Sequence, residues 1–183
     1  MTTPTSLYIT KVFFCITVEK IAADSSTLIL LAKVTLLRDF TAEKNIVITS
    51  MVEAEVLKKN ELEDAQIISA LLREKRIRKH NEKIQFQRFM TDFGIEAGEA
   101  EVLALAYNDN IILATDDWRA IKACKILGVR FITAIHCLIY LVNKGKIDRK
   151  MGRAKLKNLE RFGRYNMDII KDAKYIIEGE KND

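Results

Sequence analysis

The chain has 183 residues, which is enough for one well-buried domain and too few for two. Hydrophobic residues make up 49% and charged residues 30%, as in an ordinary globular protein, and no run approaches the ~18 uncharged apolar residues of a membrane span. The net charge is +5, and the 3 cysteines suit neither a disulfide framework nor a thiolate zinc site. We therefore expect a soluble protein of the reducing cytoplasm with no membrane partner.

Strands and helices alternate in the first sixty residues. Apolar runs predict strands at residues 20–24 and 45–49. Ser25 and Ser26 are predicted to cap a helix at 27–33, and a further helix is predicted at 50–59. The chain thus begins as βαβα.

Helices dominate the middle of the chain, and alternation then resumes. Helical patterns cover residues 61–74, 82–93 and 98–107, and the charged stretch 75–80 separates the first two. Strands follow at 111–115 and 129–132, each succeeded by a helix, at 118–127 and 135–143. This order predicts an α/β fold with a parallel sheet and helices on both faces.

Two more helices are predicted at the C-terminus, at 149–162 and 167–178. We divide the chain into an N-terminal extension or added strand (1–19), an α/β domain (20–147) and a C-terminal helical flank of the same domain (148–183).

Two glutamates interrupt apolar helical faces. Residues two apart on a helix point about 200° from each other, so only one glutamate of a neighbouring pair can face a shared crevice. The apolar residues place Glu55 and Glu99 inside the apolar sector and Glu53 and Glu101 outside it. A glutamate there costs several kcal/mol unless it is paired, protonated or bound to a metal.

Aspartates follow two of the predicted strands. Asp24 ends the first strand, and Asp116 and Asp117 follow the strand at 111–115. In open parallel sheets the strand ends and the helix starts beside them face one crevice, so these acids are expected to converge with Glu55 and Glu99. Each acid alone has a structural alternative, because acids also cap helices and favour their first turn. Asp24, Asp117, Glu55 and Glu99 together indicate one site.

The acidic segments resemble those of the PIN domain, a small nuclease fold found in VapC-type toxins and RNA-processing enzymes. Residues 21–29 (IAADSSTLI) resemble its first acidic segment and 47–56 (VITSMVEAEV) its second. Residues 98–106 (GEAEVLALA) and 112–117 (ILATDD) are similar to the third and fourth segments of a subgroup of predicted nucleic-acid-binding PIN proteins, and 163–170 (GRYNMDII) resembles its tail. Departures are the long N-terminus before Asp24 and Thr133-Ala134, where the subgroup more often has Gly-Thr.

The resemblance implies a three-layer α/β/α sandwich with a central, mainly parallel sheet and extra C-terminal helices. It also implies a metal-dependent endoribonuclease, as in the toxin of a toxin–antitoxin module, and favours RNA over DNA. A small antitoxin protein and a second copy of the chain are the candidate protein partners. The alternative is a catalytically silent PIN module with a nucleic-acid-binding or regulatory role.

Carboxylate oxygens suit Mg²⁺ or Mn²⁺ rather than zinc. Asp24, Glu99 and Asp117 are predicted to hold the metal directly or through water, and Asp116 is the substitute for Asp117. Glu55 is predicted to position a second metal or a water, so that Asp24, Glu55, Glu99 and Asp117 form the catalytic set. No Ser-His-Asp or Cys-His arrangement competes with metal-activated water.

A basic cluster lies between the acidic segments. Its members are Arg73, Lys75, Arg76, Arg78, Lys79 and Lys83. Such a cluster favours a polyphosphate partner through counterion release, although a solvated helix–loop face has the same composition. A second basic run at 144–157 extends this surface or binds an acidic partner.

The two histidines are not predicted to be catalytic. His136 lies in a strongly apolar helix and is expected to be a packing residue, whereas His80 is a surface residue or a phosphate contact. A phospho-accepting receiver domain also carries acids at strand ends, but residues 131–133 lack the lysine that it needs.

Overall fold

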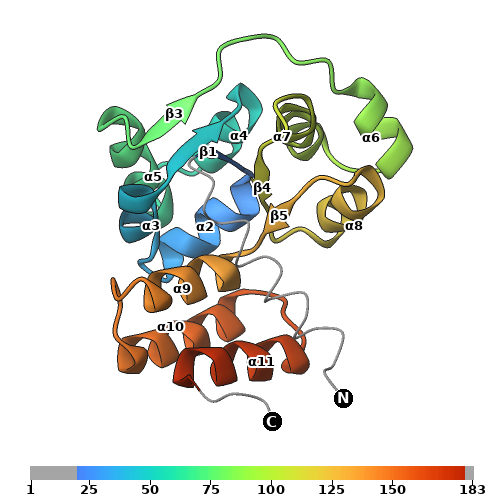
Figure 1. The fold of residues 1–183 in the computed structure, drawn as a ribbon. Coiled ribbons are helices and arrows are strands. Elements are labelled where there is room, and N and C mark those ends of the chain that lie inside the picture. The colour runs from blue at the N-terminus through green and yellow to red at the C-terminus, as the bar shows by residue number, and fades with distance from the viewer. Residues whose placement is uncertain (1–19, 180–183) are drawn as a thin grey trace.

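A computed structural model describes residues 20–179 as an α/β fold around one sheet (Figure 1). The five strands are all parallel. They are β1 (Lys20–Ala23), β2 (Asn45–Ile48), β3 (Ile77–Lys79), β4 (Ile112–Ala114) and β5 (Phe131–Ile132). The helices of these residues are α2 (Ser25–Lys33), α3 (Leu37–Glu43), α4 (Ser50–Val56), α5 (Glu63–Arg73), α6 (Gln87–Phe93), α7 (Ala97–Asn108), α8 (Trp118–Leu127), α9 (Ala134–Asn143), α10 (Arg149–Phe162) and α11 (Met167–Glu178).

The strand order in the sheet is β3-β2-β1-β4-β5. The chain builds outward from β1 to β3 and then crosses back to β4, on the other side of β1. Ligands of open α/β sheets bind at the carboxyl ends of the strands where the order reverses in this way. The carboxyl ends of β1 and β4, called the acidic edge below, lie at this reversal.

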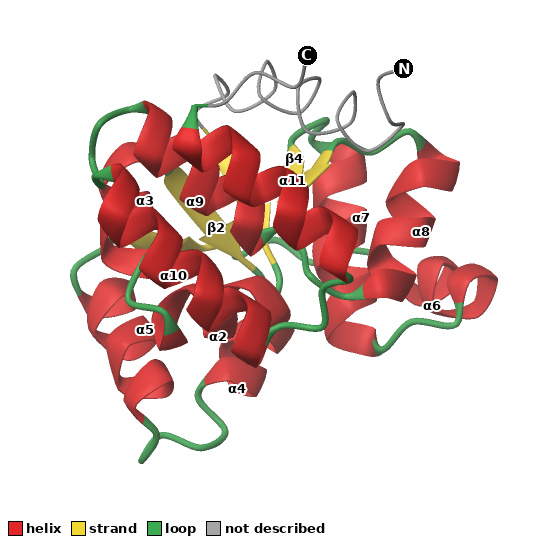
Figure 2. Cartoon of the chain, turned by 90° about the horizontal axis from the view of Figure 1, so that it is seen from below, coloured by secondary structure: helices red, strands yellow, loops and turns green. Residues whose placement is uncertain are grey.

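Helices cover both faces of the sheet. Contacts join α2 to α4, α5 and α9, and α3 to α9, whereas α7 packs on β1, β4 and α8. Figure 2 shows the helices layered around the strands. The predicted three-layer α/β/α arrangement with a parallel sheet is confirmed. No helix within residues 20–179 has the length and apolar character needed to cross a membrane.

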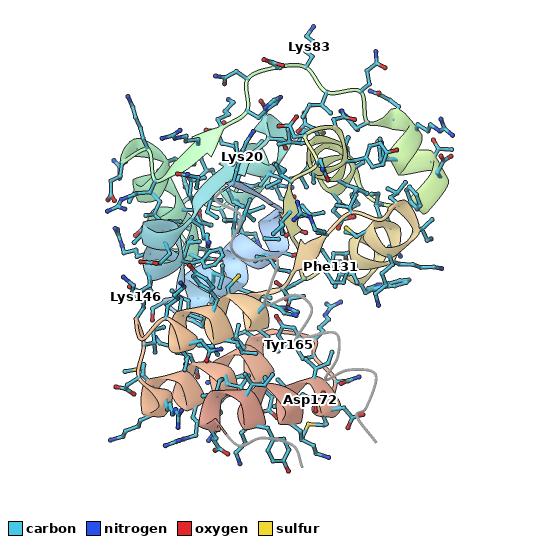
Figure 3. The ribbon with its side chains drawn as sticks, in the orientation of Figure 1. Lys20, Lys83, Phe131, Lys146, Tyr165 and Asp172 are labelled. Carbon is cyan, nitrogen blue, oxygen red and sulfur yellow. The ribbon has the colours of Figure 1, made fainter. Side chains whose placement is uncertain are left out.

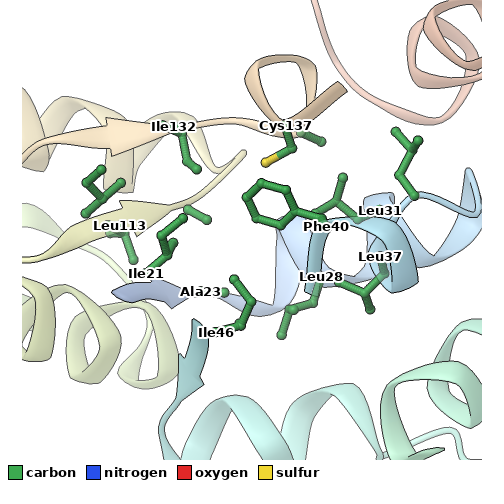
Figure 4. Close-up of a cluster of buried hydrophobic side chains, with 14 of the residues drawn as sticks. Ile21, Ala23, Leu28, Leu31, Leu37, Phe40, Ile46, Leu113, Ile132 and Cys137 are labelled. Carbon is green, nitrogen blue, oxygen red and sulfur yellow. The ribbon is translucent and has the colours of Figure 1, made fainter. Parts of the chain in front are cut away.

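The main core lies between the sheet and the layer formed by α2, α3 and α9 (Figure 4). Ile21, Ile46 and Leu113 of the strands meet Phe40 of α3, and all four are at most 2% exposed. Burying such a side chain contributes roughly 1.5–3 kcal/mol. This packing fixes the strand ends that carry the acids.

The C-terminal helices stack outside this layer. Helix α10 contacts both α9 and α11. A Cβ at Gly152 of α10 would lie 2.8 Å from a methyl of Val142 and 3.2 Å from one of Ile177, so only glycine permits this close approach. The predicted helical flank is therefore packed on the α/β core.

Four local predictions need correction. The charged stretch 75–80 contains the edge strand β3, in which Ile77 alone is buried. Helix α3 was not predicted, and α6 covers only part of the helix expected at 82–93. Ser25 and Ser26 lie inside α2, and Asp24 is its N-cap. The predicted extension 1–19 lies outside the described residues.

Candidate active site

All five predicted acids lie on elements that meet at the acidic edge. Asp24 directly follows β1, and Asp116 and Asp117 directly follow β4. Glu99 lies in the first turn of α7. Glu55 lies in α4, whose N-terminus follows β2.

Asp24 is a buried carboxylate held by neutral donors. It is 1% exposed, and its Oδ1 accepts from the Ser26 hydroxyl at 2.8 Å and the Thr27 N–H at 3.0 Å. Its Oδ2 accepts from the Thr115 hydroxyl. Burial raises the pKa of Asp24 to about 7, although these hydrogen bonds oppose the shift. At neutral pH Asp24 therefore exchanges a proton readily.

Asp116 ties three parts of the chain to β4. It accepts from the Thr27 hydroxyl of α2 at 2.7 Å, from the Ala134 N–H of α9 at 3.0 Å, and from the Tyr165 hydroxyl. Burial raises the pKa of Asp116, and these three contacts oppose the rise. The Ser26 hydroxyl accepts the Asp116 N–H at 2.9 Å while donating to Asp24, so the two aspartates share one hydrogen-bonded network.

Asp117 is the N-cap of α8. Its Oδ1 accepts from the N–H groups of Arg119 and Ala120 at 2.7 and 3.0 Å. The Asp117 N–H donates to the Thr115 hydroxyl at 3.2 Å, and the same hydroxyl donates to Asp24. The Asp117 side chain thus has the helix-capping role that the sequence left open as an alternative. The Thr115 hydroxyl links the Asp117 backbone to the Asp24 network.

Glu99 completes a capping box at the start of α7. Its Oε2 accepts from the Glu96 N–H at 3.0 Å. Partial burial raises the pKa of Glu99, the bond from Glu96 opposes this, and the negative charges of Asp117, Glu96 and Glu55 raise it further. Asp117 and Glu55 are therefore close enough to Glu99 to disfavour its charged form.

Glu55 is exposed, so its predicted place inside the apolar sector of its helix is wrong. In the two turns of α4 only Val52 and Val56 are buried, whereas Met51 is 36% exposed and does not mark the core side. Glu55 instead lies over the start of α7, where its Oε2 would be 3.3 Å from a Cβ on Gly98. This places it beside Glu99 from the solvent side.

The neighbours of these glutamates have structural partners. Glu53 forms an ion pair with Lys79 at 2.8 Å. Glu101 accepts from the Met51 N–H at 3.1 Å and thereby joins α7 to the start of α4. Neither is available as a ligand in this arrangement.

The carboxylates divide into two groups along the acidic edge. Asp24 and Asp116 share one hydrogen-bonded network, and in the second group the charges of Asp117 and Glu55 act on Glu99. Within residues 20–179, no three His, Cys, Asp or Glu side chains form a group that could hold a metal ion. Mg²⁺ commonly keeps several waters and binds through one or two carboxylates, so the all-oxygen chemistry of the second group fits it.

The basic cluster is spread along β3 rather than gathered at the acidic edge. Arg73, Lys75 and Arg76 precede β3 and therefore lie at the opposite edge of the parallel sheet. Lys79 ends β3 and is paired with Glu53. Lys83 lines a cavity of about 410 Å³ with Asn108, at the end of α7 remote from Glu99.

Figure 3 shows the same separation. Lys83 and Lys146, one from each basic run, lie at the periphery and far from Tyr165, the residue that contacts Asp116. Two cations, Lys125 and Arg164, line a groove together with Asp116 and Asp117. Sequence reasoning did not select Arg164.

Several site residues were missed because they carry no charge. Ser26, Thr27 and Thr115 supply the hydroxyls around Asp24 and Asp116, and Tyr165 reaches Asp116 from the connection between α10 and α11. Thr27 and Thr115 lie within segments with family resemblance, and Tyr165 follows Gly163 in the tail segment. That resemblance was the one available signal for them.

Comparison with known proteins agrees with this fold. A family model described as a PIN domain matches residues 20–173, which is most of the chain. A search of curated proteins found no match.

Proposed function

The chain belongs to the PIN-domain family, whose members are generally nucleases, and from this membership we propose that it is an endoribonuclease using Mg²⁺ or Mn²⁺ at the acidic edge. The observation that carries the proposal is the convergence of Asp117 and Glu55 on the half-buried Glu99, whose pKa is raised by burial and raised further by these two negative charges. Converging carboxylates are relieved by a divalent cation.

Glu99 and Asp117 would hold the ion, with Asp24 and Asp116 behind them and Glu55 on the solvent side. When bound, a divalent ion lowers the pKa of water and stabilises charge on the leaving oxygen. Asp24 and Asp116 already accept hydrogen bonds from protein donors. By contrast, Oε1 of Glu99 and Oδ2 of Asp117 have no hydrogen bond to residues 20–179. These two oxygens are the ones proposed to face the substrate.

The raised pKa values assign proton roles to the chain itself. Asp24, with a pKa of about 7, can hold or release a proton at neutral pH. The Thr115 hydroxyl lies between Asp24 and the backbone of Asp117 and can relay a change in that proton to the second group. Glu99, half-buried and raised in pKa, is proposed to accept a proton from the attacking water.

RNA is proposed as the substrate from family membership. Arg164 beside the acids would meet a phosphate close to the scissile bond. The cluster of Arg73, Lys75, Arg76, Arg78, Lys79 and Lys83 is proposed to contact more distant phosphates, because it lies away from the acidic edge.

The test is cleavage of a structured RNA with Mn²⁺, Mg²⁺ or EDTA. Asp117→Asn and Glu99→Gln keep the capping oxygens and remove only charge, so each should reduce cleavage by about 100-fold or more without unfolding the protein. Glu160→Gln, an exposed acid on α10, is the matched control and should cleave normally. Equal cleavage by all proteins would identify a contaminating nuclease.

A catalytically silent nucleic-acid-binding module is the second candidate. Both Asp24 and Asp116 are saturated by protein donors, and residues 20–179 contain no preformed three-ligand group. This function predicts RNA binding that is unchanged by EDTA and no metal-dependent cleavage. Binding and cleavage measured on the same RNA separate the two candidates.

We further propose that the chain is the toxin of a toxin–antitoxin module, that a small antitoxin protein binds it, and that it forms a homodimer. A short neighbouring gene for a DNA-binding protein, whose product abolishes cleavage when co-purified, would support the toxin role. A cytoplasmic location is proposed because the described cysteines, Cys124 and Cys137, are both free and buried.

A further inference from the structure

A groove of about 840 Å³ adjoins the acidic edge. Its polar end is formed by Ser26, Asp116 and Asp117, and its other walls come from α8, β5, α9 and the connection between α10 and α11. This volume lies in the range of pockets that bind small molecules or parts of larger ligands. The proposed chemistry uses the acidic end and leaves the rest of the groove unassigned.

His136 presents an unsatisfied polar atom in this groove. Its Nδ1 accepts from the Thr133 N–H at 3.1 Å in the capping box of α9. Burial lowers the pKa of His136 to about 4, so the ring is neutral, and because Nδ1 is an acceptor its proton is on Nε2. Nε2 is fully buried and has no hydrogen-bond partner.

A buried N–H without an acceptor is rare and costs about 1–3 kcal/mol. No acceptor among the described residues lies within hydrogen-bond distance of Nε2. The prediction that His136 is merely a packing residue therefore leaves Nε2 unexplained. An acceptor supplied by a ligand would satisfy it.

The residues that line the groove indicate the chemistry of that ligand. Trp118, Phe131, Phe162 and Tyr165 line it, and the groove is mainly apolar. Flat aromatic groups stack on such side chains. The donor on His136 is neutral, and the formal charges of Asp116 and Asp117 are balanced by those of Lys125 and Arg164, so the aromatic walls favour a flat group with an acceptor on its edge over a bare phosphate.

We propose that this groove is a nucleobase pocket, and that a bound base displaces the side chains that cover Nε2 of His136, so that its N–H donates to an acceptor on the base edge. The base belongs to the RNA nucleotide next to the phosphate at the acidic edge, so this inference rests on the proposed function and adds a recognition site to it. Trp118 and Tyr165 form its stacking walls. His136 is then the residue that selects among bases.

Trp118 is the single tryptophan of the chain, is 65% exposed and lines the groove, so its fluorescence reports on occupancy. The full chain is titrated in EDTA with the four ribonucleosides and, separately, with ribose 5-phosphate. At least one nucleoside should change the fluorescence with saturation, and ribose 5-phosphate should not. No saturable change with any nucleoside, or an equal change with ribose 5-phosphate, would overturn the proposal.

Two substitutions isolate the donor. His136→Asn keeps an acceptor near Nδ1 for the Thr133 N–H but lacks the distant donor, whereas His136→Gln places an amide N–H near Nε2. Affinity for the bound nucleoside should fall by about fivefold to tenfold in His136→Asn and be largely retained in His136→Gln. Unchanged affinity in His136→Asn would overturn the role of Nε2.

NMR gives a readout that does not depend on a variant folding. The chain has 2 histidines, so the imidazole N–H signal of His136 can be assigned by comparison with His80→Asn. Nucleoside binding should shift that signal, and a static signal at saturation would contradict the contact.

The source of the base is tested by competition. Structured RNA in EDTA should displace the nucleoside, and failure to compete would overturn the assignment to an RNA substrate. Nucleosides contain no phosphodiester, and EDTA removes metal. Loss of the nuclease proposal would therefore leave nucleoside binding intact, and absence of nucleoside binding would leave RNA cleavage intact.

Discussion

At the scale of single residues, the site uses hydroxyl groups where an ion pair might be expected. Asp24 and Asp116 are satisfied by Ser26, Thr27 and Thr115, none of which carries charge. Neutral donors offset less of the desolvation penalty than a cation would, so burial dominates and both pKa values rise. The consequence is that Asp24 titrates near neutrality, and that the pKa of Asp116 also lies above its usual range.

The first residue-scale prediction concerns Asp24 and pH. Its folded pKa of about 7 lies above the ordinary 3.8, so its contribution to stability is complete below pH 3.8 and is lost as the pH rises through about 7. Asp24→Asn avoids this loss, and the Thr115 hydroxyl can turn to accept from the new amide. The variant should gain up to about 4 kcal/mol over the wild type between pH 4 and pH 8, as measured by urea unfolding in EDTA. A stability difference that is the same at both pH values would contradict the burial of a titrating Asp24.

The second residue-scale prediction concerns Tyr165. Tyr165→Phe removes the hydroxyl that donates to Asp116 and leaves a buried carboxylate oxygen without that donor. The expected loss is about 1–3 kcal/mol of unfolding free energy. Tyr175→Phe on α11, where the tyrosine is 44% exposed, is the control and should change stability little. Equal stability of both variants would show that the hydroxyl contact contributes nothing.

At the scale of elements, three helices direct their N-termini at the acidic edge. Asp24 is the N-cap of α2, Asp117 is the N-cap of α8, and Glu99 closes the capping box of α7. The partial positive charge of each helix start stabilises the carboxylate placed there. The same acids therefore serve the fold and the proposed chemistry, so a loss of cleavage alone does not prove a catalytic role.

The element-scale prediction separates these two roles at α8. Asp117→Ala removes the oxygen that caps the Arg119 and Ala120 N–H groups and should cost about 1 kcal/mol. Asp117→Asn retains a capping oxygen and should keep nearly the full unfolding free energy. Cleavage should fall in both variants, while stability should fall in only one. If cleavage tracks stability instead, Asp117 is a structural cap and not part of the active site.

At the scale of the whole molecule, the C-terminal helices are tied to the acidic edge. Gly163 permits this, because a Cβ there would collide with the Tyr165 ring and lie 2.8 Å from the Leu159 carbonyl oxygen. Tyr165 then reaches Asp116, which also binds α2 and α9. The flank thus completes both the network of Asp116 and one wall of the groove.

The prediction at this scale concerns metal and global stability. Mn²⁺ that binds only the folded chain should raise the unfolding free energy by about 2.7 kcal/mol at 100 times its dissociation constant. The gain should be larger at pH 8 than at pH 5.5, because protons compete at Glu99, whose pKa is raised. The double variant Glu99→Gln, Asp117→Asn should show no gain, and NaCl of equal ionic strength controls for screening. A gain that persists in the double variant would place the metal elsewhere.

Sequence reasoning was most successful where local signals agree. The predicted bounds of α8, α10 and α11 match the structure, because Asp117, Asp148 and Asn166 cap these helices and Gly128, Gly163 and Gly179 follow them. Strong apolar runs likewise predicted β1, β2 and β4. Strand β3 was missed because it contributes one buried side chain, Ile77, inside a charged segment. Exposed charged side chains are common on edge strands, but they remove the apolar pattern by which a strand is predicted from the sequence.

The sequence by itself determined the α/β class, the parallel sheet and the five acids, because these follow from local periodicity and from residues placed at strand ends and helix starts. Only the tertiary structure decided which acids share a network, that Glu55 is exposed, and that the basic cluster lies away from the acidic edge. It also revealed the groove at His136 and the reach of Tyr165 to Asp116. These features depend on the distance and direction between segments far apart in the chain, which the packing of helices on the sheet sets and no local pattern encodes.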